Sequence, residues 1–161
     1  MEPGTVVVAP SKPTMLVIGD SLCESGWPEL IENHIINNSC VGGTGLIRSF
    51  MDRVPVYEHD DGYYDMTVIA LGMNDAIMGV DADEFELAYR SLYDTVYNPV
   101  CLLPPLSDKP EIQVLMSEYH RRIKSFCSVA VHSAPSDALD GVHYSRDADE
   151  INRQIVSALY Q

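Results

Sequence analysis

Short runs rich in β-branched residues alternate with longer amphipathic segments from residue 14 onward, and this alternation is the strongest constraint on the fold. The runs that predict strands are Thr14–Ile18, Asn37–Val41, Thr67–Leu71, Val100–Leu103 and Ser128–His132. Strands that alternate with helices predict a parallel sheet covered on both faces. We therefore expect a doubly wound, three-layer α/β/α domain of flavodoxin-like type, with five parallel strands in the order 2-1-3-4-5.

The amphipathic segments between these strands predict the helices. The first predicted helix spans Trp27–Ile36, and the third runs from Pro110 to about Phe126. The second begins at a capping box of Asp83 and Glu86, and its apolar face consists of Phe85, Ala88, Leu92 and Val96. The last is capped by Asp147 and Glu150. Residues 1–13 contain three prolines and read as an irregular lead-in. Residues 14–161 are long enough for one domain with a proper core.

Charge and cysteine content limit the partners and the compartment. The net charge of −14 disfavours nucleic acids and anionic membrane surfaces as partners. The beginning of the chain has no basic segment before an apolar run, and no run is long enough to cross a bilayer, so we expect a cytoplasmic protein without membrane insertion. The four cysteines are widely spaced without a C-x-x-C pair, and without an export signal we expect them to be buried free thiols: Cys23, Cys40, Cys101 and Cys127.

Polar residues or glycines follow four of the predicted strands at the point where each strand ends. Ser21 follows the first strand, Gly43 the second and Asn74 the third, while Asp140 and His143 lie in the segment after the fifth. The carboxyl ends of parallel strands meet at one edge of the sheet, where loops form binding sites. The sequence therefore predicts that these residues converge.

These residue types are the ones that acyl transfer requires. A serine hydroxyl needs an adjacent base, which His143 supplies for Ser21, and Asp140 can orient the imidazole. The tetrahedral intermediate needs hydrogen-bond donors aimed at its oxyanion, and we expect the backbone N–H groups of Ser21 and Gly43 and the side-chain amide of Asn74 to form that hole.

The four blocks together resemble the SGNH, or GDSL, hydrolase family. They read Gly19-Asp20-Ser21, Asn38 to Gly43, Gly72-x-Asn74-Asp75 and Asp140-x-x-His143, in the family's order. The resemblance implies an esterase that works through an acyl-enzyme on Ser21 with His143, Asp140 and the oxyanion hole just described, and without metal or other cofactor. The second block departs from the family, because Thr44 and Gly45 follow Gly43 where relatives often carry Gly-Asp-Thr.

The substrate is not encoded in these blocks. Short loops leave little sequence for a lid or a long acyl groove, so we expect hydrolysis of short-chain esters of small molecules or carbohydrates, with carbohydrate O-acetyl groups among the candidates. The alternatives are a lysophospholipase or thioesterase for longer chains, a non-hydrolytic acyltransferase or binding domain on the same fold, and a flavodoxin-like nucleotide binder. The oligomeric state is left open.

Other polar residues near these blocks have structural explanations. We expect Asp20 and Asp75 to shape their turns, His34 to pack on a helix, His59 to lie in a solvated loop and His120 to lie on a helix surface.

Overall fold

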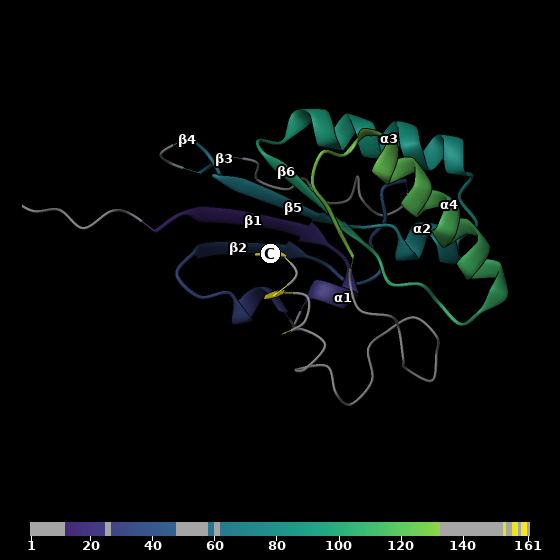
Figure 1. The fold of residues 1–161 in the computed structure, drawn as a ribbon, viewed down its shortest axis with the longest axis horizontal. Coiled ribbons are helices and arrows are strands. Elements are labelled where there is room, and N and C mark those ends of the chain that lie inside the picture. Colours follow the sequence, from purple (N-terminus) through teal and green to yellow (C-terminus); the bar gives the residue numbers. More distant parts are fainter. Residues whose placement is uncertain are drawn as a thin grey trace, which may run out of the picture.

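A five-stranded parallel sheet forms the centre of the structure (Figure 1). The structure, a computed structural model, describes residues 12–24, 27–47, 58–59, 62–132, 153, 156–157 and 159–160. The strands in spatial order are β2 (Ile35–Cys40), β1 (Thr14–Gly19), β5 (Met66–Ala70), β6 (Pro99–Leu103) and β7 (Ala130–His132). All four neighbouring pairs are parallel. This topology confirms the predicted order 2-1-3-4-5.

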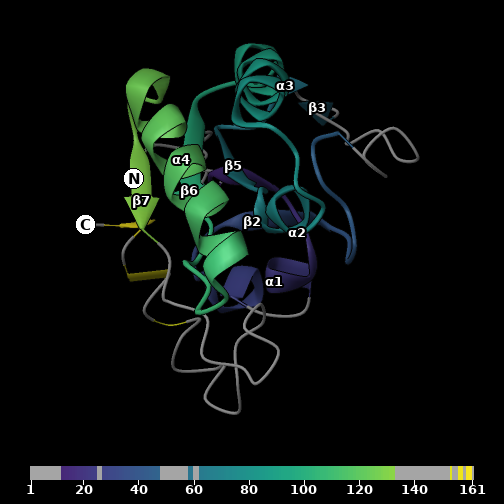
Figure 2. The ribbon, with the colours of Figure 1, turned by 90° about the vertical axis from the view of Figure 1, so that its right-hand side faces the viewer.

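Alternating side chains of β1 reach two separate cores on opposite faces of the sheet. Leu16 and Ile18 belong to the core beneath α3 (Ala82–Thr95) and α4 (Pro110–Phe126). On the other face, the core contains Met15 and Val17 of β1, together with Cys23, Trp27 and Ile31, and Val156 and Leu159 pack against it. Figures 1 and 2 show α2, α3 and α4 on one side of the sheet and α1 (Ser21–Glu24) on the other. Two cores divided by one sheet make the three layers that the sequence predicts.

Aromatic packing joins the two long helices. The rings of Phe85 and Tyr119 stack with centroids 3.8 Å apart, and Tyr89 is fully buried beside them. A salt bridge also joins the two helices, with Arg122 Nη1 of α4 lying 2.7 Å from Asp83 Oδ1 of α3. The bounds of α4 confirm the predicted helix from Pro110 to about Phe126. The predicted apolar face of α3, which includes Phe85, lies in the core or packs against it.

The predicted helix over Trp27–Ile36 is wrong. Only a 3₁₀ turn, η1 (Trp27–Leu30), forms there, and Asn33 then adopts a left-handed φ of 61°. Ile35 and Ile36 enter β2, where they pair with residues of β1. β-branched residues favour strands, and pairing with β1 overrides the helical spacing of the apolar residues.

Two smaller expectations also need correction. The N-cap of α3 is Asp81, whose side chain accepts a 2.8 Å hydrogen bond from the Asp83 N–H, so Asp83 lies in the first turn instead of capping it. Where a loop is expected around His59, β3 (Glu58–His59) pairs antiparallel with β4 (Gly62–Tyr63). The first 11 residues and the caps Asp147 and Glu150 lie outside the described residues.

All four cysteines form disulfides, so the expectation of free thiols is wrong. Cys23 pairs with Cys40 and Cys101 with Cys127, with Cα–Cα distances of 5.8 Å and 6.6 Å. These distances lie in the normal range for a disulfide. The partners are 17 and 26 residues apart in sequence, and only the packing of the elements brings them together.

Within the described part of the chain, no helix combines the length and the apolar character that a bilayer crossing demands.

We predict that the variant Cys101→Ala/Cys127→Ala is destabilised by about 3 kcal/mol, because opening a loop of this length gives the unfolded chain more conformational entropy. Urea unfolding of the variant and the unreduced wild type measures this difference. A thiol titration of unfolded, unreduced wild type provides the control and should detect no free thiol. Detection of four thiols would contradict both disulfides.

Candidate active site

The serine at the end of β1 lies on a tight turn that a buried carboxylate shapes. Asp20 is 1% exposed, and its Oδ1 accepts a 3.0 Å hydrogen bond from the Leu22 N–H. Ser21 is the first residue of α1 and is half-buried. This contact agrees with the turn-shaping role expected for Asp20, and it places Ser21 at the carboxyl edge of the sheet.

The loop after β2 is tied to the same strand end. The carbonyl oxygen of Gly19 accepts a 3.0 Å hydrogen bond from the Val41 N–H, and the Thr44 hydroxyl lies 3.2 Å from the same oxygen. Between these two attachments, Gly43 adopts a left-handed φ of 76°. A Cβ built on Gly43 would meet nothing within 4 Å. Glycine is thus favoured here by its backbone conformation, and the space beside its Cα is open.

The loop after β5 brings Asn74 to the glycine loop. Asn74 lies in α2 (Met73–Ile77), and its Nδ2 donates a 2.9 Å hydrogen bond to the Thr44 carbonyl. An amide nitrogen carries two hydrogens, so this bond orients the side chain and leaves a second N–H to donate. Gly43 and Asn74 line one hollow of about 170 Å³, which is also lined by Gly45, Asp75, Met78 and Val80.

Asp75 braces this hollow from within. Its side chain is 2% exposed and accepts hydrogen bonds from the Leu46 N–H at 3.0 Å and the Ile47 N–H at 3.2 Å. Burial raises the pKa of the carboxyl above its ordinary value, and the hydrogen bonds from these backbone groups oppose that rise. A Cβ at Gly45 would lie 2.8 Å from Asp75 Oδ1, so the glycine makes room for the carboxylate. Asp75 therefore fixes the loop after β2, whereas the sequence analysis expected it to shape its own turn.

Three of the predicted site residues thus follow three adjacent strands of the sheet: Ser21, Gly43 and Asn74. Thr44 connects their loops, because its hydroxyl contacts Gly19 and its carbonyl accepts from Asn74. The sequence analysis did not single out Thr44 for this role, although its place directly after Gly43 was the available signal. Asp140 and His143 lie outside the described residues.

The histidines outside the blocks have ordinary partners. His120 is buried, and its Nε2 lies 2.6 Å from the Pro104 carbonyl oxygen, so its predicted place on the helix surface is wrong. His34 lies in a turn with Nδ1 2.9 Å from the Glu32 carbonyl oxygen, and its ring packs against Tyr160. Among the residues that the structure describes, no group of three or more His, Cys, Asp or Glu side chains could hold a metal ion.

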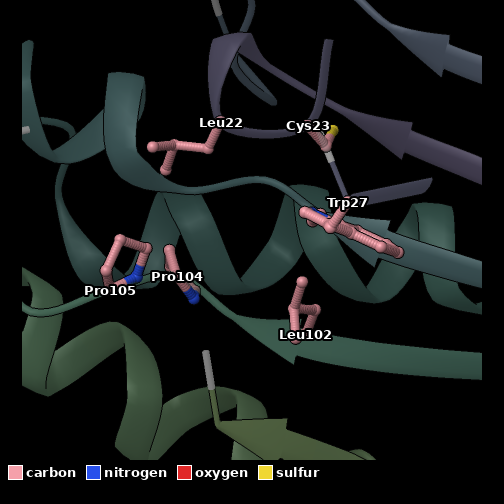
Figure 3. Close-up of a pocket in the computed structure, with 7 residues that line it drawn as sticks. Leu22, Cys23, Trp27, Leu102, Pro104 and Pro105 are labelled. Carbon is pink, nitrogen blue, oxygen red and sulfur yellow. The ribbon is translucent and has the colours of Figure 1, made fainter. Parts of the chain in front are cut away.

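A second hollow is lined mostly by apolar side chains, two of them from α1 (Figure 3). Its volume is about 240 Å³, and its lining comprises Leu22, Cys23, Trp27, Ala70, Leu102, Pro104 and Pro105. It is the larger of the two, but none of the predicted site residues lines it. The smaller hollow, which Gly43 and Asn74 line, is therefore the one that the predicted site residues share.

Comparison with known proteins gives a match at the level of structure. No family model and no curated protein matches the sequence. A member of the lipolytic G-D-S-L family from Veillonella parvula superposes with a TM-score of 0.70 at 14% identity, covering 91% of this chain and 96% of that chain. An acetylxylan esterase from Geobacillus stearothermophilus has a TM-score of 0.64 at 17% identity, and the match covers 94% of this chain and 95% of that chain. A family two carbohydrate esterase from Clostridium thermocellum has a TM-score of 0.65 at 15% identity, and the match covers 94% of this chain and 63% of that chain. The chain therefore has the SGNH, or GDSL, hydrolase fold, as the four sequence blocks imply.

We predict that the stability advantage of the wild type over Asp75→Asn decreases as the pH rises from about 3 to about 7. Below the ordinary pKa of 3.8 the carboxyl is protonated in both the folded and the unfolded protein. As the pH rises above that value, the unfolded chain loses its proton first, because the folded pKa is raised, and the folded protein loses stability until its own pKa is passed. Asparagine does not titrate, so urea unfolding of both proteins across this range isolates the effect. An advantage that grows with pH would contradict it.

Proposed function

We propose that the protein is a serine esterase that cleaves short-chain carboxylic esters through an acyl-enzyme on Ser21. The observation that carries the proposal is the hydrogen-bonded connection of the Ser21, Gly43 and Asn74 loops at the carboxyl edge of three adjacent strands. The SGNH hydrolase fold and the four sequence blocks support the same function. On the resemblance of the sequence blocks, His143 is the proposed base and Asp140 its proposed orienting acceptor.

In the proposed first step, His143 takes the proton from the Ser21 hydroxyl while its oxygen attacks the ester carbonyl. The carbonyl oxygen becomes an oxyanion, which accepts from the Ser21 N–H, the Gly43 N–H and the second amide N–H of Asn74. His143 then returns the proton to the departing alcohol, which leaves an acyl group on Ser21. A water molecule repeats the sequence, again with His143 as base, and releases the acid.

The rigidity of the donors is what makes them effective. A donor that is already oriented needs no reorganisation as the oxyanion develops, and loss of one such donor typically costs on the order of 3 kcal/mol of transition-state stabilisation. Asn74 is oriented by the Thr44 carbonyl, and the conformation of Gly43 is held between the Val41 and Thr44 attachments to Gly19.

The short loops around the candidate site favour a short acyl group, because they leave little chain for a lid or a long acyl groove. Two of the similar structures are described as an acetylxylan esterase and a carbohydrate esterase, which favours O-acetyl groups of carbohydrates as substrates. The partner we propose is therefore a small-molecule or carbohydrate ester.

The disulfides bear on the compartment. Disulfides persist mainly in oxidising environments, and cytosolic thiols are usually kept reduced. The expectation of free thiols followed from the expected cytoplasmic location, and the structure instead pairs all four cysteines. We propose that the protein works in an oxidising compartment.

We expect Ser21→Ala to abolish ester cleavage, with a loss of kcat on the order of 10⁴- to 10⁶-fold, because it removes the nucleophile. Hydrolysis of p-nitrophenyl acetate and labelling by a serine-directed fluorophosphonate measure the loss. Ser39→Ala on neighbouring β2 is the matched control and should retain activity, and thermal unfolding should show that both variants fold. Retained turnover or labelling in Ser21→Ala would contradict the proposal, and acceptor-dependent transfer without free acid would identify an acyltransferase instead.

We expect kcat/KM to be highest for acetyl and propionyl esters and to fall for chains of eight or more carbons, because the short loops leave little chain to form a long acyl groove. A series of p-nitrophenyl esters from acetate to dodecanoate tests this order. A preference for chains of eight or more carbons would favour the lysophospholipase or thioesterase alternative.

A further inference from the structure

The Cys23–Cys40 disulfide joins two of the loops that form the candidate site. Cys23 lies two residues after Ser21 in α1, and Cys40 ends β2 three residues before Gly43. Both cysteines are buried, with exposures of 0% and 7%. The bond therefore gives a short covalent connection between the proposed nucleophile and the proposed oxyanion-hole glycine, which are far apart along the chain.

The end of β1 is shaped around this bond. Gly19 pairs with Cys40 in the β1–β2 register. A Cβ at Gly19 would lie 2.2 Å from Cys23 Sγ and 2.9 Å from the Ala70 carbonyl oxygen, which is closer than real contacts allow. The glycine of the Gly-Asp-Ser block thus makes room for the disulfide.

The short helix α1 packs against β2. The helix has only four residues, so its own backbone hydrogen bonds give it little stability. Asn38 bridges the two elements, because its Nδ2 donates to the Cys23 carbonyl at 3.3 Å and its Oδ1 accepts from the Cys40 N–H at 3.0 Å. This bridge depends on one half-buried side chain, whereas the disulfide fixes the same two backbones covalently.

We propose that Cys23 and Cys40 are positioning residues of the active site, and that their disulfide holds the Ser21 and Gly43 N–H groups in the mutual alignment that the oxyanion requires. This inference rests on the esterase function proposed above. Misplacement of reacting groups by about 1 Å can cost on the order of 100-fold in rate. Loss of the bond therefore lowers kcat more than it changes KM, because the alignment matters most in the transition state.

The second disulfide provides a matched control. Cys101–Cys127 closes a loop of 26 residues, compared with 17 for Cys23–Cys40, so the two bonds should stabilise the fold by similar amounts. Cys127 directly follows the end of α4, before β7 begins, and hence lies toward the amino edge of the sheet, opposite the candidate site. An effect of stability alone would appear in both variants.

The experiment compares Cys23→Ala/Cys40→Ala with Cys101→Ala/Cys127→Ala, at a temperature where circular dichroism shows both to be folded. The readouts are kcat and KM for p-nitrophenyl acetate and the rate of fluorophosphonate labelling. We expect kcat and labelling to fall about tenfold or more in the first variant, with KM within about twofold of wild type, and the second variant to keep wild-type kcat. Equal kcat in the two variants would overturn the proposal. A wild type that neither labels nor hydrolyses any ester would instead refute the proposed function, and the positioning role with it.

A second measurement decides the case if the first variant does not fold. In Cys101→Ala/Cys127→Ala protein the Cys23–Cys40 bond is the remaining disulfide, and dithiothreitol reduces it under native conditions. One thiolate of the reductant attacks a sulfur to form a mixed disulfide, and the second closes the ring, so two electrons and two protons convert the cystine to two thiols and the reductant to its cyclic disulfide. Activity should fall on reduction and return on reoxidation. Unchanged activity, with both thiols shown by alkylation and mass spectrometry to be free, would overturn the proposal.

Discussion

The parallel alignment of β2, β1 and β5 is the constraint on which the candidate site depends. In this register Gly19 lies opposite both Cys40 and Ala70, so three strands end at the same level. The carbonyl of Gly19 then accepts from the Val41 N–H and lies within hydrogen-bond distance of the Thr44 hydroxyl, and the Thr44 carbonyl accepts from Asn74. A shift of one strand by a single residue would turn its side chains to the opposite face and separate these partners.

Glycine serves different physical purposes at neighbouring positions of this edge. Gly43 is required by a left-handed backbone conformation and leaves open space in front of it, which suits the approach of a substrate carbonyl. Gly45 is required because the Asp75 carboxylate occupies the place of a Cβ. That carboxylate is costly to bury, as its raised pKa indicates, and its hydrogen bonds to the Leu46 and Ile47 N–H groups offset part of the cost. A flexible sequence is thereby held as a defined loop.

The Cys23–Cys40 disulfide links the core on one face of the sheet with the candidate site at its edge. Cys23, Cys40 and Trp27 belong to the same buried cluster, which packs under β1. Packing of this cluster therefore fixes the position of α1, of which Ser21 is the first residue. The same arrangement explains why Gly19 has no side chain, since the sulfur of Cys23 fills that space.

Local pattern determined the strands, the sheet order and the residues at the strand ends. The strands and the helix Pro110–Phe126 were predictable because each depends on the residue types within a short segment and on which of its side chains are apolar. The segment after Trp27 was not predictable, because Ile35 and Ile36 fit a helix by spacing and a strand by type, and only pairing with β1 decides between them. His120 could not be placed, because its partner is a carbonyl 16 residues away at Pro104. The sequence by itself determined that Ser21, Gly43 and Asn74 follow strands that end at one edge of the sheet. The tertiary structure alone decided which cysteines meet and how Thr44 connects the loops, since these contacts join residues that are distant in the chain and neighbours only in space.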